Sequence, residues 1–406
     1  MIHCAPTSGE SLGVKHNNAR DLTTISFAFL FAFLGAGAAQ PFVIDFLHDG
    51  KGLPMNQASL VLATVYFTFV VFRFFIGFLI DLLGLHLAKI IGIATYAVFP
   101  FLIYRTDSFP ALLAAGVLWG IGAPLLWTSA MVQVMNTSSP TRFAGSTGIV
   151  RGGAMIGHLF GLYLLSLVYR TRGYESVFLL AAALGVAAVL AMVLSPNRPV
   201  ERKKPQLRTF FRIMRSHQTK AVAAMLLCSG LGYGVVLNGL KAHIEATCGP
   251  EWLEDIMPFF FVAAIVACFL GGRICDLTGR WPTFGWAFAL GAAGMWIGGA
   301  CTHPVLLMGA MVLVGIQNAV VPLAALGWIG DVTSPEDRPS VMGYILCFRE
   351  LGVAIAILIG GVLRAAEGAA AAPTVLRAFA VASLLCAATA FLVAFLTWPR
   401  RGGTRA

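Results

Sequence analysis

Three arginines and one glutamate lie inside long apolar segments, where charge is costly. Arg73 and Arg151 each stand in such a segment, and Arg349 is followed directly by Glu350 in a third. A charged group within a membrane span is by default a candidate functional group, because hydrocarbon does not solvate it. Three guanidinium groups against one carboxylate leave net positive charge, and guanidinium forks suit planar oxyanions. The sequence therefore predicts a site for a small anion.

Further polar side chains extend this candidate site. His158 lies seven residues after Arg151 and shares its helix face, where it could relay protons or serve as a hydrogen-bonded core histidine. The amides of Gln317 and Asn318 could bind a polar solute, although such groups more often join helices to one another. Glu350 is the candidate proton-coupling group. We predict that the substrate-binding residues are Arg73, Arg151, His158, Gln317, Asn318 and Arg349.

Each arginine also has a structural interpretation. Arg73 and Arg151 lie within about two turns of the expected cytoplasmic side, so their heads could reach water along their apolar stems. Arg349 is deeper, and Glu350 could neutralise it in a structural ion pair. Both interpretations stay open at the level of the sequence.

The elements that must hold these residues follow from composition. Of the 406 residues, 58% are hydrophobic and only 11% are charged. This excludes a water-soluble globular protein, a disordered chain and a nucleic-acid-binding module, because polar surface is too scarce. A membrane-spanning helix needs about 20 mostly apolar residues. We therefore predict an all-α integral membrane protein with twelve spans, near 23–45, 57–80, 87–104, 111–135, 145–168, 175–194, 220–241, 256–273, 283–301, 304–330, 340–363 and 375–397.

The twelve segments divide into two sets of six around a polar middle. Most of the 28 Lys and Arg residues, Lys89 among them, fall on the side that holds both termini and this middle. Since cytoplasmic loops collect basic residues, we predict cytoplasmic termini in a multi-pass protein of the cell (inner or plasma) membrane. The expected order is a tail (1–22), a first half (23–194), a basic linker with a short amphipathic helix (195–219), a second half (220–397) and a basic tail (398–406).

A fixed offset relates the two halves. The Gly-Asp-Gly pattern of residues 77–84 recurs at residues 272–279, and Gly148 recurs as Gly343, in each case 195 positions later. A constant offset in separate segments predicts two six-helix halves related by an axis along the membrane normal. The binding site of such a protein lies between the halves near the midplane.

In these features the chain resembles the major facilitator superfamily over all twelve spans. The most specific element is the loop at 77–84, with its second copy at 272–280. The resemblance implies alternating access and a latch, in which a carboxylate pairs with basic groups or a helix N-terminus on the cytoplasmic face. The latch residues that it implies are Gly77, Asp81, Gly84, Arg142, Gly272, Asp276, Gly279 and Arg280.

The chain departs from the family pattern at the first copy of the latch. Leu82 and Leu85 stand where the family usually has basic residues, so we expect this copy to be weaker or to use Arg142.

The chain also departs from the pattern of one subfamily, the proton-coupled drug exporters. Gly116 replaces the helix 4 arginine of proton-coupled drug exporters, and span 145–168 lacks their proline, which counts against a drug/proton antiporter.

A comparison with nitrate/nitrite porters is also incomplete. Arg73, Gly77 and Asp81 are similar to the helix 2 segment of those porters, whose arginine binds the anion. Their second arginine, in helix 8, corresponds to Cys268 here. The nitrate hypothesis therefore lacks one of its two anchors.

We conclude from the sequence that the protein is a secondary transporter of a small anionic or polar metabolite, with protons as a candidate coupling ion. It has no P-loop, and we expect no cofactor, no bound metal, no nucleic-acid partner, no enzymatic activity and a monomer in the lipid bilayer. Two alternatives stay open. One is a non-transporting accessory or sensor protein. The other is a transporter of copper or a metal chelate, suggested by soft ligands at Met131, Met135, Met225, Cys228, Cys268 and Cys347.

Overall fold

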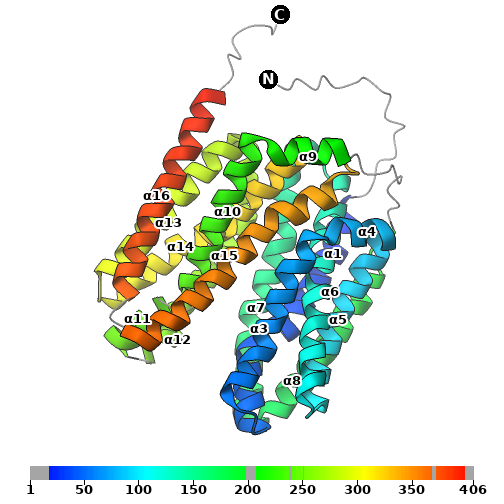
Figure 1. Cartoon of the computed structure of the whole chain (residues 1–406), viewed down its shortest axis with the longest axis vertical. Helices are drawn as coiled ribbons and strands as arrows, with labels where there is room; N and C mark the ends of the chain where they lie inside the picture. The colour runs from blue at the N-terminus through cyan, green and yellow to red at the C-terminus, as the bar shows by residue number, and fades with distance from the viewer. Residues whose placement is uncertain (1–17, 198–206, 237–239, 250, 368–371, 398–406) are drawn as a thin grey trace, which may run out of the picture.

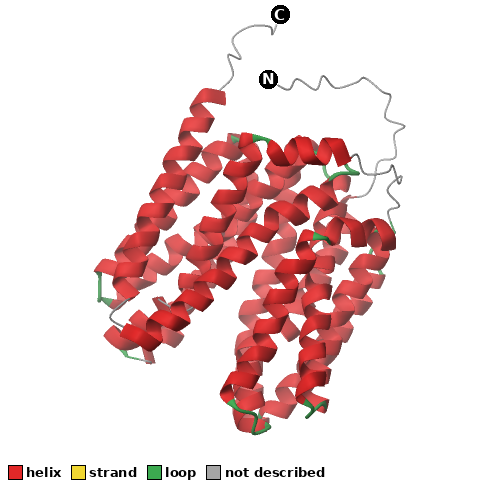
Figure 2. Ribbon diagram, in the orientation of Figure 1, coloured by secondary structure: helices red, strands yellow, loops and turns green. Residues whose placement is uncertain are grey.

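The computed structural model describes residues 18–197, 207–236, 240–249, 251–367 and 372–397. Helices make up nearly all of this part of the chain, which contains no strand (Figure 2). Length and hydropathy mark nine stretches of the described residues as long and apolar enough to cross a membrane. The predicted all-α membrane fold is confirmed. The predicted tails, up to residue 17 and from 398, and linker residues 198–206 lie outside the described residues.

Six long helices precede the linker. The π-helical turn η1 interrupts the first of them and a second, η2, ends it. A single-residue break at Phe75 divides the second helix into α3 and α4. Their bounds are α1 Asn18–Ala32, η1 Phe33–Gly37, α2 Ala38–Asp45, η2 Phe46–Gly50, α3 Met55–Phe74, α4 Ile76–Leu83, α5 Leu85–Arg105, α6 Phe109–Thr137, α7 Phe143–Arg172 and α8 Tyr174–Val193.

Six more long helices follow α9, which occupies the part of the linker where a short amphipathic helix is expected. In Figure 1, α9 lies across one end of the bundle, called the α9 end below. The bounds are α9 Leu207–Arg215, α10 His217–Val235, α11 Lys241–Cys248, α12 Glu251–Thr278, α13 Arg280–Ala300, α14 Pro304–Val332, α15 Arg338–Glu367 and α16 Ala372–Thr397.

The 195-residue repeat extends to the contacts between the halves. Gly343 of α15 lies against the main-chain carbonyl of Arg73 in α3, and Gly148 of α7 lies against that of Cys268 in α12. The two pairs are equivalent under the repeat. Glycine allows both approaches, because a Cβ at Gly343 would stand 2.6 Å from the carbonyl oxygen. The halves therefore meet along two seams: α3 and α4 with α15, and α7 with α12.

The halves lie close together at the α9 end and diverge toward the opposite end (Figure 1). At the α9 end, equivalent turns join α4 to α5 and α12 to α13. Each turn contains a glycine in the left-handed region, Gly84 with φ 80° and Gly279 with φ 96°. Side chains with a Cβ rarely adopt this conformation, so the repeated glycine has a structural cause.

Candidate binding site between the halves

The central feature of the interface is one carboxylate shared by two arginines. Glu350 Oε1 accepts hydrogen bonds from Arg73 Nη1 at 3.3 Å and from Arg349 Nη1 at 3.0 Å. Arg73 comes from the first half and Arg349 from the second, so this ion-pair group crosses the interface. The side chains of Arg73, Arg349 and Glu350 are 6%, 12% and 17% exposed. These three residues, which the sequence analysis placed at one site, lie together.

Close packing of α10 on α15 fixes the position of Arg349. Gly230 of α10 lies directly against the main-chain carbonyl of Arg349, where no Cβ would fit. The guanidinium of Arg349 then lies 5.4 Å from the ring centroid of Tyr233, one turn further along α10. Its Nη2 donates to Asn318 Oδ1 of α14 at 3.0 Å. Asn318 therefore belongs to the arginine group, and its role in substrate binding stays a prediction.

Arg151 completes the charged group from α7. Its guanidinium lies 5.4 Å from the ring centroid of Trp127 in α6, and it interacts with the thiol of Cys268. It also interacts electrostatically with Arg349, Glu350 and Arg73. The three arginines are therefore close enough for the charge of each to affect the others. Among the described residues, no carboxylate hydrogen-bonds to Arg151. Glu350 is thus the acid of a group that contains three cations.

The arginines have more donors than the site supplies acceptors. Each guanidinium carries five N–H groups. The Nε atoms of Arg73, Arg151 and Arg349 are all buried, and none has a hydrogen-bond partner among the described residues. Buried donors normally find partners, so unsatisfied donors in a native structure call for an explanation. A ligand rich in acceptor oxygens would satisfy them.

The remaining predicted site residues, His158 and Gln317, contact other side chains than the three arginines. His158 stacks on Phe261 of α12, with ring centroids 5.3 Å apart, and thus contacts the second half. Gln317 is buried and lies against Gly291 of α13, so it fills space between helices of the second half. Its Nε2 has no partner among the described residues.

Several aromatic residues of the site were not identified from the sequence. Phe69 could have been found, because it stands one turn before Arg73 in α3, and its ring centroid is 5.1 Å from that guanidinium. The other rings belong to helices that are separate from those of their partners: Trp127 contacts Arg151, Tyr233 contacts Arg349, and Phe33 contacts Trp127. No spacing rule in a single sequence links them to the arginines.

A second buried polar cluster lies inside the first half. Lys89 Nζ donates to Gln133 Oε1, and also to Ser195 Oγ at 3.0 Å. Gln133 Nε2 in turn donates to Asp21 Oδ1 at 2.6 Å. Lys89 and Asp21 are fully buried. The cluster joins α1, α5, α6 and the residues after α8.

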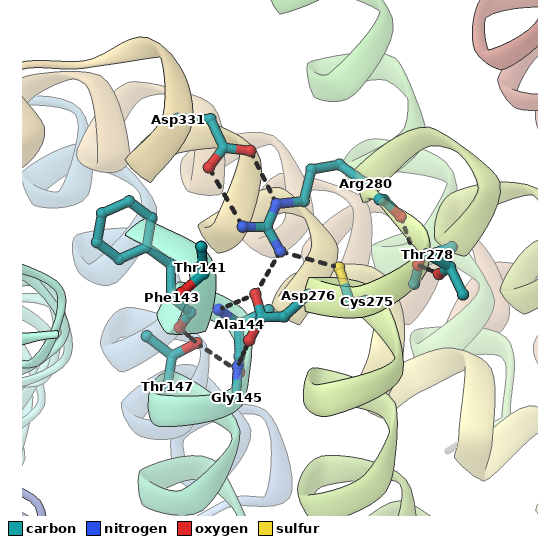
Figure 3. A network of polar contacts seen from close by, with 12 residues as sticks. Thr141, Phe143, Ala144, Gly145, Thr147, Cys275, Asp276, Thr278, Arg280 and Asp331 are labelled. Atoms are coloured by element: carbon teal, nitrogen blue, oxygen red, sulfur yellow. Dashed lines mark hydrogen bonds and ion pairs between the residues drawn. The ribbon is translucent and has the colours of Figure 1, made fainter. Parts of the chain in front are cut away.

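The second copy of the predicted latch forms a network at the α9 end (Figure 3). Asp276 accepts hydrogen bonds from the main-chain N–H groups of Ala144 and Gly145, at 3.1 and 2.7 Å, in the first turn of α7. Arg280 bridges Asp276, at 2.5 Å, and Asp331 of α14, at 2.8 Å. The carboxylate therefore caps a helix of the other half, where the helix dipole favours negative charge.

Glycine lets the two halves approach at this network. A Cβ at Gly272 would lie 2.5 Å from the carbonyl oxygen of Ala144. The equivalent residue, Gly77, lies against Ser340 of α15 in the first copy.

The first copy of the latch differs from the second. Asp81 is exposed, and Arg142, its expected partner, is exposed at the end of a short 3-10 turn, η3 Pro140–Arg142. The residue equivalent to Ala144 is Pro339, which has no N–H to donate. The N-terminus of α15 therefore offers Asp81 one donor fewer than α7 offers Asp276.

The candidate soft ligands lie in different surroundings. The described residues contain no group of three or more His, Cys, Asp or Glu that could hold a metal ion. Met131, Met135 and Met225 are buried in the hydrophobic core. Cys268 contacts Arg151.

Comparison with known sequences gives the chain a family context. The model of the Major Facilitator Superfamily matches residues 25–282. The chromaffin granule amine transporter of Rattus norvegicus is 23% identical over 298 residues, which are 69% of this chain and 52% of that protein. The synaptic vesicular amine transporter of Homo sapiens is 23% identical over 363 residues, 84% of this chain and 64% of that protein. The chain thus spans between half and two thirds of the length of these relatives.

Two solved structures share the fold. The human organic anion transporter MFSD10 (TETRAN) superposes with a TM-score of 0.73 at 15% identity, covering 91% of this chain and 99% of that one. The E. coli fucose:proton symporter FucP superposes with a TM-score of 0.73 at 14% identity, covering 91% and 98%. At these identities the likeness establishes the fold alone.

Proposed function

Because this chain belongs to the Major Facilitator Superfamily, we propose that it is a secondary active transporter that carries a small anionic metabolite across a membrane by alternating access. Arg73, Arg151 and Arg349 bind the anion between the halves. The α9 end is cytoplasmic, since it holds the basic linker. The contacts between the halves at the α9 end close the cytoplasmic side. The structure then corresponds to the state of the transport cycle that is open to the side away from the cytoplasm.

The observation that carries this proposal is the imbalance of charge and donors at the interface. Three arginines lie at the interface with one carboxylate, which pairs with two of them, and the Nε atoms of all three are buried without a partner among the described residues. A bound oxyanion supplies both the missing negative charge and the missing acceptors. A cationic substrate would add charge to a group that is already positive.

Glu350 is the proposed coupling group. In its charged form the carboxylate occupies Nη donors of Arg73 and Arg349. Protonation of Glu350 removes its negative charge and weakens both ion pairs, which frees those donors for the substrate anion. One proton and one anion then bind together, and the direction of net transport follows their combined gradient.

The alternative substrate class is a cationic amine, because the relatives named above are amine transporters. It requires Glu350 to bind the substrate amine while Arg73 and Arg349 lose their shared partner. Leaving two buried arginines without their acid is strongly unfavourable. We therefore rank the anion first.

The test is thermal unfolding of the purified protein against acetate, benzoate, citrate, nitrate, phosphate, benzylamine and Cu(I). A ligand that binds the folded state raises Tm by mass action. We expect an anion to raise Tm, and Arg349→Gln to abolish the shift. Arg172→Gln is the matched control, because Arg172 is exposed at the end of α7. A shift with benzylamine alone would refute the anion proposal, and a shift with Cu(I) alone would favour a metal transporter.

Transport itself is tested in proteoliposomes with the anion that binds. Uptake driven by an inward proton gradient, absent from Arg349→Gln vesicles, is the expected result. Binding without any uptake or exchange would identify an accessory or sensor protein that has kept the fold.

A further inference from the structure

We propose that the transported anion carries its charge on a planar aromatic body. This inference rests on the proposed anion transport and narrows its substrate class. It is drawn from the rings that lie against the three arginines and from the ring contacts that join two of these rings across the interface.

Each arginine of the site has an aromatic ring against its guanidinium. The distances to the ring centroids are 5.1 Å for Arg73 and Phe69, 5.4 Å for Arg151 and Trp127, and 5.4 Å for Arg349 and Tyr233. All three rings are only partly buried. A ring attracts the cation and leaves N–H groups of the guanidinium available for an oxyanion.

Two of these rings, Trp127 and Tyr233, belong to one continuous series across the interface. From Trp127 the series passes to Phe33 at 5.5 Å and on to His158 at 6.5 Å. His158 then stacks on Phe261 of the other half at 5.3 Å. Phe261 contacts Phe260 at 5.4 Å, which leads to Tyr233 at 6.0 Å. Ring contacts therefore join the aromatic neighbour of Arg151 to that of Arg349.

The first half contributes to this series through an irregular element. Phe33 is the first residue of the π-helical turn η1, and its ring also contacts Tyr96 at 5.8 Å. Such turns occur often at functional sites, because they redirect a side chain out of the regular helical pattern. Phe33 is partly exposed, as expected for a ring that faces a ligand.

Two of the neutral polar groups near the arginines are engaged by protein side chains. Gln40 Oε1 accepts a hydrogen bond from Tyr66 at 3.0 Å, and Asn318 Oδ1 accepts one from Arg349 at 3.0 Å. Gln317 packs against α13, and its Nε2 is a buried donor with no partner among the described residues. A polyhydroxylated anion would place hydroxyl groups against the rings beside the arginines, and buried polar groups without partners oppose binding. The body of the substrate therefore contacts rings, which favours an aromatic anion over a sugar acid.

The test compares anions of similar size by calorimetric titration of the purified, full-length protein: benzoate, cyclohexanecarboxylate and gluconate. We expect benzoate to bind about fivefold more tightly than cyclohexanecarboxylate, from ring–ring contact, and gluconate to bind most weakly. Trp127→Leu should reduce the preference for benzoate over cyclohexanecarboxylate to less than about twofold. Trp296→Leu is the matched control, because Trp296 is exposed on α13.

Tyr233→Leu provides an independent variant if Trp127→Leu does not fold. Equal affinity for benzoate and cyclohexanecarboxylate would overturn the aromatic inference and leave the anion transporter standing, as would tight binding of gluconate. Binding of benzylamine without binding of any of the three anions would overturn the proposed function as well.

Discussion

Phe143 and Arg338 hold equivalent places in the two halves, 195 residues apart, and they touch. The guanidinium of Arg338 lies 4.9 Å from the centroid of the Phe143 ring. Residues related by a twofold axis meet only close to that axis, so this pair marks where it passes through the α9 end. Arg338 also donates to Asn136 Oδ1 of α6 at 2.5 Å, which adds a polar contact between the halves. With Asp276, these residues close the α9 end.

The two copies of the latch should differ in strength. Asp276→Asn weakens charge-assisted hydrogen bonds to Arg280 and to the first turn of α7, so we expect the free energy of unfolding to fall by about 1–3 kcal/mol. Asp81→Asn should have a smaller effect, because Asp81 is exposed. Thermal or chemical unfolding of both variants measures the difference. Equal losses, or a larger loss for Asp81→Asn, would contradict this ranking.

The conformational counterpart can be measured on the same variants. Opening of the α9 end should become more frequent in Asp276→Asn, because the cap on α7 holds the seam between α7 and α12 closed. A single cysteine placed at Ala144 on a background without reactive cysteines should then react faster with a water-soluble maleimide. An unchanged rate would argue that the network stabilises the second half alone.

Replacement of Glu350 should separate anion binding from proton coupling. Glu350→Gln cannot take up a proton, and its neutral amide competes less for the donors of Arg73 and Arg349. We expect anion exchange between the two sides of proteoliposomes to continue, while uptake driven by a pH gradient is lost. Gradient-driven accumulation by Glu350→Gln vesicles would exclude Glu350 as the coupling group.

The buried cluster around Lys89 should be structural. Lys89→Met leaves Asp21 in the core without its cationic neighbour and removes the donor to Gln133 and Ser195, so we expect a loss of about 3–5 kcal/mol in unfolding free energy. The double variant with Asp21→Asn should recover part of this loss. Denaturant unfolding gives both values. A Lys89→Met protein of normal stability but altered anion affinity would point to a role in transport.

The contact of α10 with α15 should not tolerate a methyl group at Gly230. Gly230→Ala pushes against the main chain at Arg349, so we expect about 1–3 kcal/mol of destabilisation together with weaker anion binding. Gly309→Ala is the matched control, because a Cβ at Gly309 meets no atom within 4 Å. Calorimetric titration and thermal unfolding of the pair test this. Anion affinity unchanged in folded Gly230→Ala would show that this contact does not position Arg349.

Most of what could be predicted from the sequence came from two features: the charged residues deep inside apolar segments, and the 195-residue internal repeat. An arginine in an apolar segment has few stable positions other than a protein interior, so Arg73, Arg151, Arg349 and Glu350 could be assigned to one site before any geometry was known. The repeat likewise identified the latch loops, because the turns at Gly84 and Gly279 require the same backbone conformation.

The neighbours of those residues could not be predicted. Trp127 and Tyr233 contact the arginines from other helices. Which ring meets which arginine depends on how each helix is rotated about its axis and on the angle at which the helices cross. Lys89 was counted among the basic residues of the cytoplasmic side, yet it is fully buried among residues of other elements. A weaker first latch stays a prediction, made from Leu82 and Leu85. The missing amide hydrogen of Pro339 supplies a cause that the loop motif does not contain.

When no substrate anion is bound, the carboxylate of Glu350 pairs with the arginines in its place. Its carboxylate joins an arginine of each half, so in the proposed cycle the empty, deprotonated protein can reorient without exposing unpaired arginines at the seam. A protonated but empty protein lacks both the carboxylate charge and the substrate charge, and its reorientation is disfavoured. The same side chain would thus keep protons from crossing alone, so that a membrane containing this protein does not lose its proton gradient when substrate is scarce.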